Sequence, residues 1–321
     1  MGLGSIKLGS LRLAVVLRQV PDPEAPLEID PATASVVEGA VPWVVDEADE
    51  AALDAALQLA AAGGGEVLAI ALGPERAEQA ARKALALGAT RALRIVEAGS
   101  SADVRVDAAL VAAVVRRESI DLLLAGAQSG PSGSGLLASA CGAALGWPWI
   151  WLVLAAELED GAPPANGGAR DDDPDRGEPG PRGARRARTA LRVVQELEGG
   201  RRRRWRIETP AVLAIQTGRY RGRMPTIRGV LAAKRHAIEL VEAAMLGVTP
   251  DAPVRALRRV GLDRPAPAGG VEWIRGSGGP DGEGPSGEGA SGVGGDGGAD
   301  ADAARRTAER LVRRLREVGA L

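Results

Sequence analysis

Short apolar runs alternate with helical patterns over the first half of the chain. Four runs have the length of β-strands and lie at residues 11–20, 66–72, 91–97 and 121–126. Between them, residues 46–63, 73–89 and 101–119 repeat apolar positions at helical spacing and carry helix start or stop signals. Strands that alternate with helices predict a parallel sheet covered by crossover helices on both faces.

The pattern changes after Pro148. Runs at 149–159, 189–200, 203–208 and 210–216 follow one another like strands joined by short turns, and Gly199 with Gly200 predicts a hairpin. We therefore expect an antiparallel strand extension of the sheet. The predicted fold class is α/β, with a mostly parallel sheet, crossover helices, this extension and a C-terminal arm that ends in a helix.

Two segments have the composition of chain that does not order itself. Residues 160–188 and 276–300 are rich in glycine, proline and charge, and they hold too few apolar residues to form a core. We predict one nucleotide-binding domain over 1–250, in which 160–188 is a disordered insertion. The arm is then 251–321, with 276–300 as its linker.

A basic amphipathic helix is predicted at the end of the arm, over residues 301–321. Its apolar stripe runs through Leu311, Leu315 and Val318. An isolated helix of this length is marginal in water, so it needs a surface to pack on. That surface is either its own domain or a partner subunit, and the sequence leaves both open.

Composition excludes several function classes. The 40 Lys and Arg are balanced by 42 Asp and Glu, so no global basic field exists to hold nucleic acid. A single cysteine, Cys141, and a single histidine, His236, allow no internal disulfide and no zinc cluster. No run approaches the roughly eighteen apolar residues of a membrane span, and no signal peptide precedes the first strand. We expect a cytoplasmic protein without direct membrane insertion.

The loop after Gly126 is the glycine-rich one among the three loops predicted at the carboxyl ends of strands. Ligands bind at that edge of a parallel sheet, which makes the loops after Val20, Leu72 and Gly126 candidates. The third reads "AQSGPSGSGLL" and enters a predicted helix from about Ser134. Backbone N–H groups at a helix start can hold a phosphate without lysine. The loop matches neither GxGxxG nor GxxxxGK[ST], so a phosphate cradle and a plain turn both remain open.

Charged clusters admit two interpretations each. The acids Asp46, Glu47, Asp49 and Glu50 could bind a metal, but acids in a first helical turn favour capping. The run of arginines at 201–204 indicates an exposed hairpin, which serves either solubility or an acidic partner surface. A catalytic His236 would need a nucleophile and an orienting acid that the sequence does not indicate, so we interpret it as a solvated residue.

The order of the segments resembles the beta subunit of electron transfer flavoproteins. The motifs that carry the resemblance are "AVVLRQVPDPEAPLEID", "VVDEADEAALDAALQL", "LGPERAEQAARKALALGATRALRI", "DLLLAGAQS", "LGWP", "VVQELEGG", "TPAVLAIQTG", "RMPTIRGVLAAKRHAIE" and "AERLVRRLREVGAL". Together they cover nearly the whole chain outside the first ten residues, the 160–188 insertion and the linker.

The resemblance implies an electron carrier subunit that is not catalytic by itself and has a fold like that of the adenine-nucleotide alpha hydrolases. It implies a heterodimer with an alpha subunit, AMP bound by this chain, and FAD mainly on the alpha subunit at the interface. Electrons would come from acyl-CoA dehydrogenases of fatty acid β-oxidation or from other flavin dehydrogenases, and would pass to a membrane quinone reductase. A subgroup of the family holds a second FAD in place of AMP. No catalytic residue, metal site or nucleic acid partner is implied.

The resemblance also implies which residues contact the nucleotide. They are Val16, Asp46, Glu47, Ala48, Asp49, Leu72, Gln128, Ser129, Gly133, Ser134 and Gly135. Where bacterial members read "QSIDGDTGQ" this chain reads "QSGPSGSGL", so Ser134 keeps a hydroxyl while Pro131, Gly133 and Leu136 replace two acids and a glutamine. Backbone contacts can survive these changes, which predicts weakened AMP binding that rests on backbone donors.

The family's partner-recognition loop falls on residues 217–224. Many members show a leucine and "NEPRY" there, whereas this chain reads "TGRYRGRM". Arg219, Tyr220 and Arg221 become the candidates for partner binding, because aromatic and arginine side chains commonly supply interface energy. Glu196 matches an acid that pairs with an arginine across the closed interface; the alternative is an ordinary charge on a strand surface.

Two other functions stay open at this point. One is a nucleotide-binding regulator of the same fold without a redox role. The other is an adenylating or hydrolytic enzyme that uses the serine-rich loop. The sequence holds no P-loop lysine, metal-ligand set or base for Ser132 or Ser134, which argues against the enzyme, and the basic terminal helix argues for a partner subunit.

Overall fold

The computed structural model describes residues 11–30, 32–33, 35–96, 103–159, 188–248 and 297–317. The predicted insertion, apart from Arg188, and most of the predicted linker lie outside these residues. The chain divides into two compact units, Met1–Asp263 and Arg264–Leu321.

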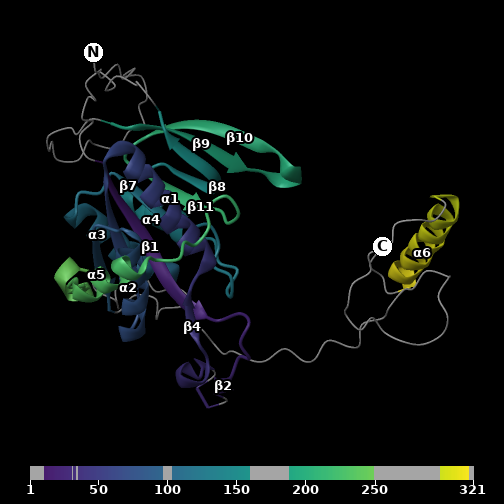
Figure 1. Ribbon diagram of the computed structural model, residues 1–321, viewed down its shortest axis with the longest axis horizontal. Coiled ribbons are helices and arrows are strands. Elements are labelled where there is room, and N and C mark those ends of the chain that lie inside the picture. The colour runs from purple at the N-terminus through teal and green to yellow at the C-terminus, as the bar shows by residue number, and fades with distance from the viewer. Residues whose placement is uncertain are drawn as a thin grey trace. The chain divides into compact units, whose positions relative to one another are not determined.

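A sheet of seven parallel strands forms the centre of the first unit (Figure 1). In spatial order these strands are β8 (Trp149–Leu158), β11 (Ala211–Ile215), β7 (Leu122–Gly126), β1 (Arg12–Pro21), β5 (Glu66–Leu72), β6 (Arg91–Ile95) and β12 (Glu239–Val241). Beyond β8 the sheet continues with β9 (Ala190–Glu196), which runs antiparallel to β8, and β10 (Arg202–Glu208), which runs antiparallel to β9. Three short strands complete the description: β4 (Trp43–Val45), antiparallel to β1, and the β2 (Ile29–Asp30) and β3 (Ser35–Val36) hairpin.

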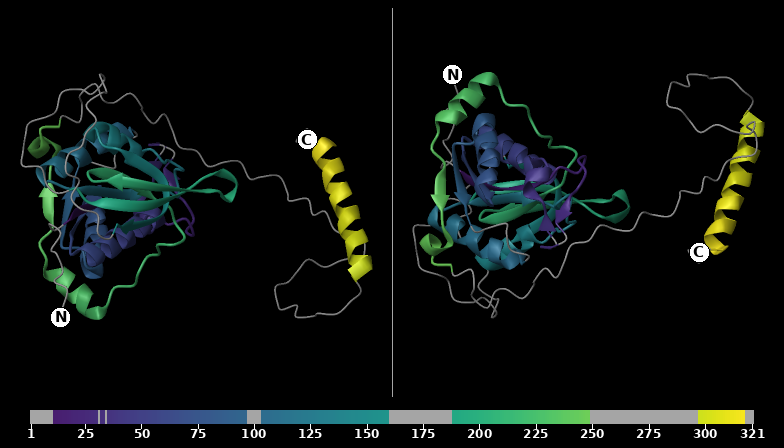
Figure 2. Two further views of the ribbon diagram at one scale, coloured as in Figure 1. Left: turned by 90° about the horizontal axis from the view of Figure 1, so that it is seen from above. Right: turned by 90° about the horizontal axis from the view of Figure 1, so that it is seen from below.

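Helices cover both faces of the sheet, as the alternation of runs predicts (Figure 2). One face packs on α1 (Glu47–Gly63) and α2 (Glu78–Leu87), and α5 (Ile227–Arg235) lies against α2. The other face packs on α3 (Val104–Arg117) and α4 (Leu137–Leu145). The short 3-10 helices are η1 (Glu38–Ala40), η2 (Glu75–Ala77), η3 (Glu198–Gly200) and η4 (Ala243–Leu246).

Strand β11 corrects the predicted antiparallel extension. It was expected to follow β10 in the extension, but it crosses back and lies between β7 and β8, parallel to both. All five of its residues are buried, which is typical of a strand at the centre of a parallel sheet. The predicted β9–β10 hairpin is confirmed, and Gly199 and Gly200 at its turn have φ of 68° and 73°.

Helix boundaries differ from the predictions by a few residues. Helix α1 is capped by Asp46 and ends at Gly63 as predicted, and the left-handed C-cap residue that follows is Gly64. Helix α4 begins at Leu137, later than the predicted Ser134, because the preceding residues close a turn of their own. That turn determines which backbone donors a ligand could reach.

The second unit contains α6 (Gly297–Glu317), which begins four residues before the predicted 301. Leu311 and Val312 on this helix are exposed. The two surfaces on which the sequence allows this helix to pack, its own domain or a partner subunit, both stay open. Among the residues that the structure describes, no helix is both long and apolar enough to span a bilayer.

Candidate functional site

The strand order reverses next to β1. From β1 the chain proceeds to β5 and β6 on one side, and β7 lies on the other side. Ligands of open parallel sheets bind at such a switch point, outside the carboxyl ends of the strands. Here that position is bounded by the end of β1, the start of α1 and the loop 127–136 after β7.

Asp49 joins the three elements at this switch point. Its Oδ1 accepts hydrogen bonds from the N–H of Gly126 at 3.0 Å and from Nη2 of Arg18 at 2.9 Å. Its Oδ2 accepts from the N–H and Nε of Arg18, each at 2.9 Å. Burial alone would lower the pKa of Arg18, but the charge and hydrogen bonds of Asp49 raise it above its ordinary value. These bonds join α1 to β1 and β7, and Asp49 is 0% exposed, so water does not compete for them.

Gly126 allows the start of α1 to approach β7. A Cβ atom at this position would lie 2.6 Å from Oδ1 of Asp49 and 2.7 Å from Cβ of Ala48. Any larger residue would push α1 away from the strand and disturb the bonds of Asp49. This role of Gly126 was not predicted; its signal in the sequence is a glycine at the end of an apolar strand.

Asp46 carries an unsatisfied carboxylate oxygen beside this junction. Its Oδ1 caps α1 by accepting from the N–H of Ala48 at 3.3 Å, and its own N–H donates to the carbonyl of Arg18 at 3.0 Å. The residue is 1% exposed, and its Oδ2 has no hydrogen bond of normal geometry among the described residues. Burial and then the charge of Asp49 raise the pKa of Asp46, while the nearby hydroxyl of Ser129 and Arg18 oppose that shift.

Asp46 Oδ2 therefore differs from the oxygens of Asp49. Buried polar atoms without partners are rare in native proteins and call for an explanation. An N–H or O–H donor from a ligand would satisfy this oxygen.

The loop after β7 uses much of its backbone for its own turn. The N–H of Ser129 donates to the carbonyl of Ser134, and the N–H of Gly133 donates to the carbonyl of Ser129, both at 2.9 Å. Nε2 of Gln128 donates to the carbonyl of Gly133 at 2.8 Å. The N–H of Ser134 donates to Oγ of Ser132 at 3.3 Å. The N–H of Gly133 is therefore engaged within the loop, and its predicted contact with a nucleotide remains a prediction.

Gly135 keeps its backbone donor. Its N–H has no hydrogen-bond partner in the described part of the chain. A Cβ atom here would lie 3.0 Å from the carbonyl oxygen of Ala127 and 3.3 Å from Nε1 of Trp151. Nε1 of Trp151 donates to that same carbonyl at 3.0 Å, so a half-exposed indole supports the loop from β8. Trp151 was not among the predicted site residues, because it lies on β8, which is separated from β7 by α4 along the chain and by β11 in the sheet.

The remaining predicted nucleotide contacts fall into two groups. The side chains of Val16, Leu72 and Ala48 are buried in the core around the switch point, so only their backbone atoms could reach a ligand. Glu47 is exposed in the first turn of α1. The structure thus brings the predicted residues to one edge of the sheet but gives them unequal access to a ligand.

Tyr220 of the predicted partner loop corrects an expectation. Its side chain is 3% exposed, its hydroxyl donates to the carbonyl of Ala156 at 3.2 Å, and it accepts from the N–H of Ala156 at 2.9 Å. Burial raises the pKa of its hydroxyl. Tyr220 fixes the loop to β8 and does not offer its ring to a partner.

The other partner candidates are more accessible. Arg219 is exposed and pairs with Glu157 at 3.0 Å, and Arg221 is exposed and donates to the carbonyl of Gly218 at 3.4 Å. Glu196 is half-buried and accepts from Nε2 of Gln216 at 3.3 Å. Its predicted pairing with an arginine of a partner remains a prediction.

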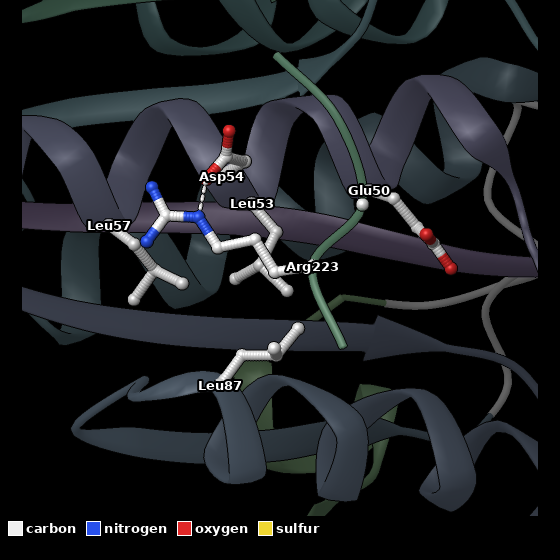
Figure 3. A pocket seen from close by; sticks show the side chains of 7 residues that line it. Glu50, Leu53, Asp54, Leu57, Leu87 and Arg223 are labelled. Atoms are coloured by element: carbon white, nitrogen blue, oxygen red, sulfur yellow. Dashed lines mark ion pairs between the residues drawn. The ribbon is translucent and has the colours of Figure 1, made fainter. Parts of the chain in front are cut away.

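A hollow lies where Gly222 and Arg223 pass close to α1 (Figure 3). Its lining residues are Glu50, Leu53, Asp54, Leu57, Leu87, Gly222 and Arg223. Arg223 forms an ion pair with the buried carboxylate of Asp54. Gly222 passes so close to Glu50 that a Cβ atom would collide with the carboxylate. These two contacts hold residues 222–223 against α1.

The sequence raised two chemical alternatives, a metal site at the acids of α1 and a catalytic role for His236. Among the described residues, no three or more His, Cys, Asp or Glu side chains are arranged to hold a metal ion. Burial raises the pKa of the Cys141 thiol to about 12, so it is protonated at neutral pH. His236 is exposed at the end of α5.

Comparisons with known proteins agree with the fold. Residues 33–246 match the family model of the electron transfer flavoprotein domain. A Methylophilus methylotrophus protein named electron transfer flavoprotein subunit beta is 28% identical over 242 residues, which are 74% of this chain and 82% of that protein. A protein of the same name from Syntrophomonas wolfei is 25% identical over 236 residues, or 73% and 81% of the two chains. Protein FixA of Rhizobium meliloti is 40% identical over 87 residues, or 27% and 30%.

Proposed function

The chain belongs to the electron transfer flavoprotein family, and on that premise we propose that it is the beta subunit of a heterodimeric electron carrier with a structural AMP. The partner is an alpha subunit that carries most of the FAD site. The pair takes electrons from acyl-CoA dehydrogenases or other flavin dehydrogenases and passes them toward a membrane quinone reductase. The beta chain itself performs no chemical step.

The observation that supports AMP is the unsatisfied Oδ2 of Asp46 beside a loop that retains a free backbone donor. A carboxylate oxygen accepts hydrogen bonds from the hydroxyl and amino groups of an adenosine but has none to offer a phosphate. The N–H of Gly135, at the entry to α4, attracts a phosphate because the helix dipole favours negative charge there. The residues at this edge therefore fit the two chemically different ends of one nucleotide.

Few residues carry this proposed binding. Asp46 and Ser129 face the adenosine end, and the Ser134 hydroxyl and the Gly135 N–H face the phosphate end. Asp49 positions them indirectly, because it holds the start of α1 against β1 and β7. The N–H groups of Gly133 and Ser134 donate hydrogen bonds within the loop. We therefore expect weaker AMP binding than a loop with three free N–H donors would give.

The role of the bound nucleotide in this proposal is positional. A ligand that joins α1 to the loop after β7 stabilises the carboxyl edge of the sheet by mass action. FAD, when bound to the alpha subunit, would supply the electron chemistry. The chain's own residues orient the interface, where Glu196, Arg219 and Arg221 are the exposed or half-exposed polar groups.

Co-expression with a candidate alpha subunit encoded beside this chain tests the proposed function. A yellow complex with one copy of each chain and flavin absorbance supports it, and mass spectrometry of the denatured complex separates one FAD plus AMP from two FAD. A colourless monomer that purifies with AMP and ignores the alpha subunit would contradict it and favour the regulator.

The nucleotide loop is tested separately by substitution. In Gly135→Val the new side chain meets the Ala127 carbonyl and the Trp151 indole, and Ser134→Ala removes a hydroxyl. We expect at least a tenfold loss of retained AMP in Gly135→Val. Gly130→Val is the matched control, because a Cβ atom at Gly130 meets nothing within 4 Å. If both test variants keep the wild-type AMP content, the loop is only a joint.

A further inference from the structure

Strand β10 is the outermost strand of the sheet. It pairs with β9 in antiparallel register from Arg202 opposite Glu196 to Glu208 opposite Ala190. No strand among the described residues pairs with its other edge. An edge strand presents a row of backbone N–H and C=O groups that can template another strand.

The half of β10 nearest the body of the protein has its charge neutralised. Arg206 pairs with Glu159 at 2.6 Å and with Glu208 at 3.0 Å, and Arg192 of β9 also reaches Glu159 at 3.4 Å. The hydrogen bond from Arg206 lowers the pKa of Glu159. This half of the hairpin therefore has little net charge to offer a partner.

The half of β10 nearest the hairpin turn is different. Arg202, Arg203 and Arg204 are all exposed, and none has a carboxylate partner in the part of the chain that the structure describes. The tip of the hairpin extends beyond the helices that cover the sheet (Figures 1 and 2). The unneutralised charge is therefore confined to an accessible strand end, although the chain as a whole has a formal charge of −2.

An aromatic side chain adds contact area beside these arginines. Trp205 is 41% exposed, and its Nε1 donates to Oε1 of Gln195 at 2.8 Å. The guanidinium of Arg203 lies over its ring, 5.3 Å from the centroid. Because strand residues alternate between faces, Arg203 and Trp205 share one face while Arg202 and Arg204 share the other. Both faces of the edge are basic.

The charge identifies the kind of strand that fits this edge. A second copy of the chain would place arginine rows side by side, and like charges across a strand pair are destabilising. An extended segment with acidic residues at alternate positions would pair its backbone with β10 and set its carboxylates against the arginines. Duplex nucleic acid needs phosphate contacts over a broad basic surface, whereas these charges follow one strand.

We propose that β10 is a docking edge for an extended acidic segment of a partner protein, which adds to the sheet as the next strand along Arg202–Arg206. Backbone hydrogen bonds supply the pairing, and the arginines select for acidic sequence. Trp205 and Arg203 cover the segment's side chains on one face. This surface is separate from the proposed nucleotide site and does not depend on it.

The test uses the full chain and a dye-labelled eight-residue peptide with glutamate at alternate positions and threonine between them. Fluorescence anisotropy at low salt measures its Kd. We expect Arg202→Glu/Arg204→Glu to weaken binding at least tenfold. The matched control, Arg228→Glu/Arg235→Glu, makes the same charge change on exposed residues of α5 and leaves the Kd within twofold.

A second peptide separates strand pairing from charge alone. Replacing its threonines by proline keeps the carboxylates but removes backbone donors, so we expect at least a tenfold loss of affinity. Equal binding of the proline peptide, or equal weakening by the α5 control, would overturn the proposal. So would tighter binding of a single-stranded RNA of equal charge that displaces the peptide.

Discussion

The carboxyl edge of the sheet at α1 and the outer edge at β10 both concentrate charge, but they use it differently. At α1 the charges are buried, and Asp49 and Arg18 satisfy each other within the chain. At the tip of β10 the arginines are exposed and have no carboxylate partner in the described chain. Buried, paired charge determines stability when one partner is lost, whereas exposed charge governs association. Substitutions in the two regions should therefore separate folding from binding.

The largest effect is expected for Asp49→Ala. It leaves the largely buried guanidinium of Arg18 without its carboxylate and removes the acceptor of the Gly126 N–H, at a cost of about 3–5 kcal/mol. Urea unfolding measures the loss. Glu47→Ala is the control, because this exposed acid lies in the same helical turn and should change the free energy of unfolding by less than about 1 kcal/mol. An equal loss of unfolding free energy in both variants would mean that the bonds of Asp49 to Arg18 and Gly126 add no stability of their own.

Gly126→Ala should have the next largest effect. Its methyl group would meet Ala48 and Asp49 at less than 3 Å, and forced overpacking costs about 1–3 kcal/mol. Gly130→Ala serves as the reference, since its Cβ atom has open space. Thermal unfolding of the two variants gives the comparison. A Gly126→Ala protein as stable as the reference would show that α1 can move away from β7 without cost.

Asp46→Asn sharpens the comparison through pH. The raised pKa of Asp46 means that the folded protein holds this proton more tightly than the unfolded chain. Its contribution to stability is complete below the ordinary aspartate pKa and is lost as pH rises through the folded pKa. Asparagine keeps the cap but does not titrate. We expect the variant to gain stability relative to wild type as pH rises through that window, in urea unfolding from about pH 3 to pH 8. A constant difference would contradict the assignment.

The smallest effect on folding belongs to β10. Arg202→Glu/Arg204→Glu changes exposed side chains that have no ion-pair partner in the described chain, so the free energy of unfolding should fall by less than about 1 kcal/mol in total, mostly because position 202 lies opposite Glu196. Chemical unfolding of the isolated chain checks this. A loss comparable to that of Gly126→Ala would mean that these arginines support the fold and would remove the contrast between the two edges.

Most strands and helices could be predicted from hydrophobic period, but the place of β11 could not. Its five apolar residues resemble the neighbouring strands in sequence, and only packing against β7 and β8 shows it to be parallel. Its continuous burial is typical of a central strand, but burial is known only from the structure. Short strands such as β12 have too few residues for a period.

The candidate site was predicted as a set of residues but not as a division of roles. Family resemblance pointed to Asp46 and Asp49 alike, yet tertiary contacts engage every oxygen of Asp49 and leave one oxygen of Asp46 unpaired. Tyr220 looked like an interface anchor because aromatic residues often are, and burial against Ala156 overrides that pattern. Sequence separation hides such contacts, since they join residues that are far apart along the chain.

The central claim is that the start of α1 and the loop after β7 hold an adenine nucleotide, and AMP-induced thermal stabilisation of the co-expressed complex tests it most directly. AMP should raise the Tm of the nucleotide-stripped wild-type complex. In Asp46→Asn the amide turns a donor toward the ligand's donors, so we predict that at least half of that rise is lost. An equal rise in both complexes, or none in the wild type, would contradict the claim.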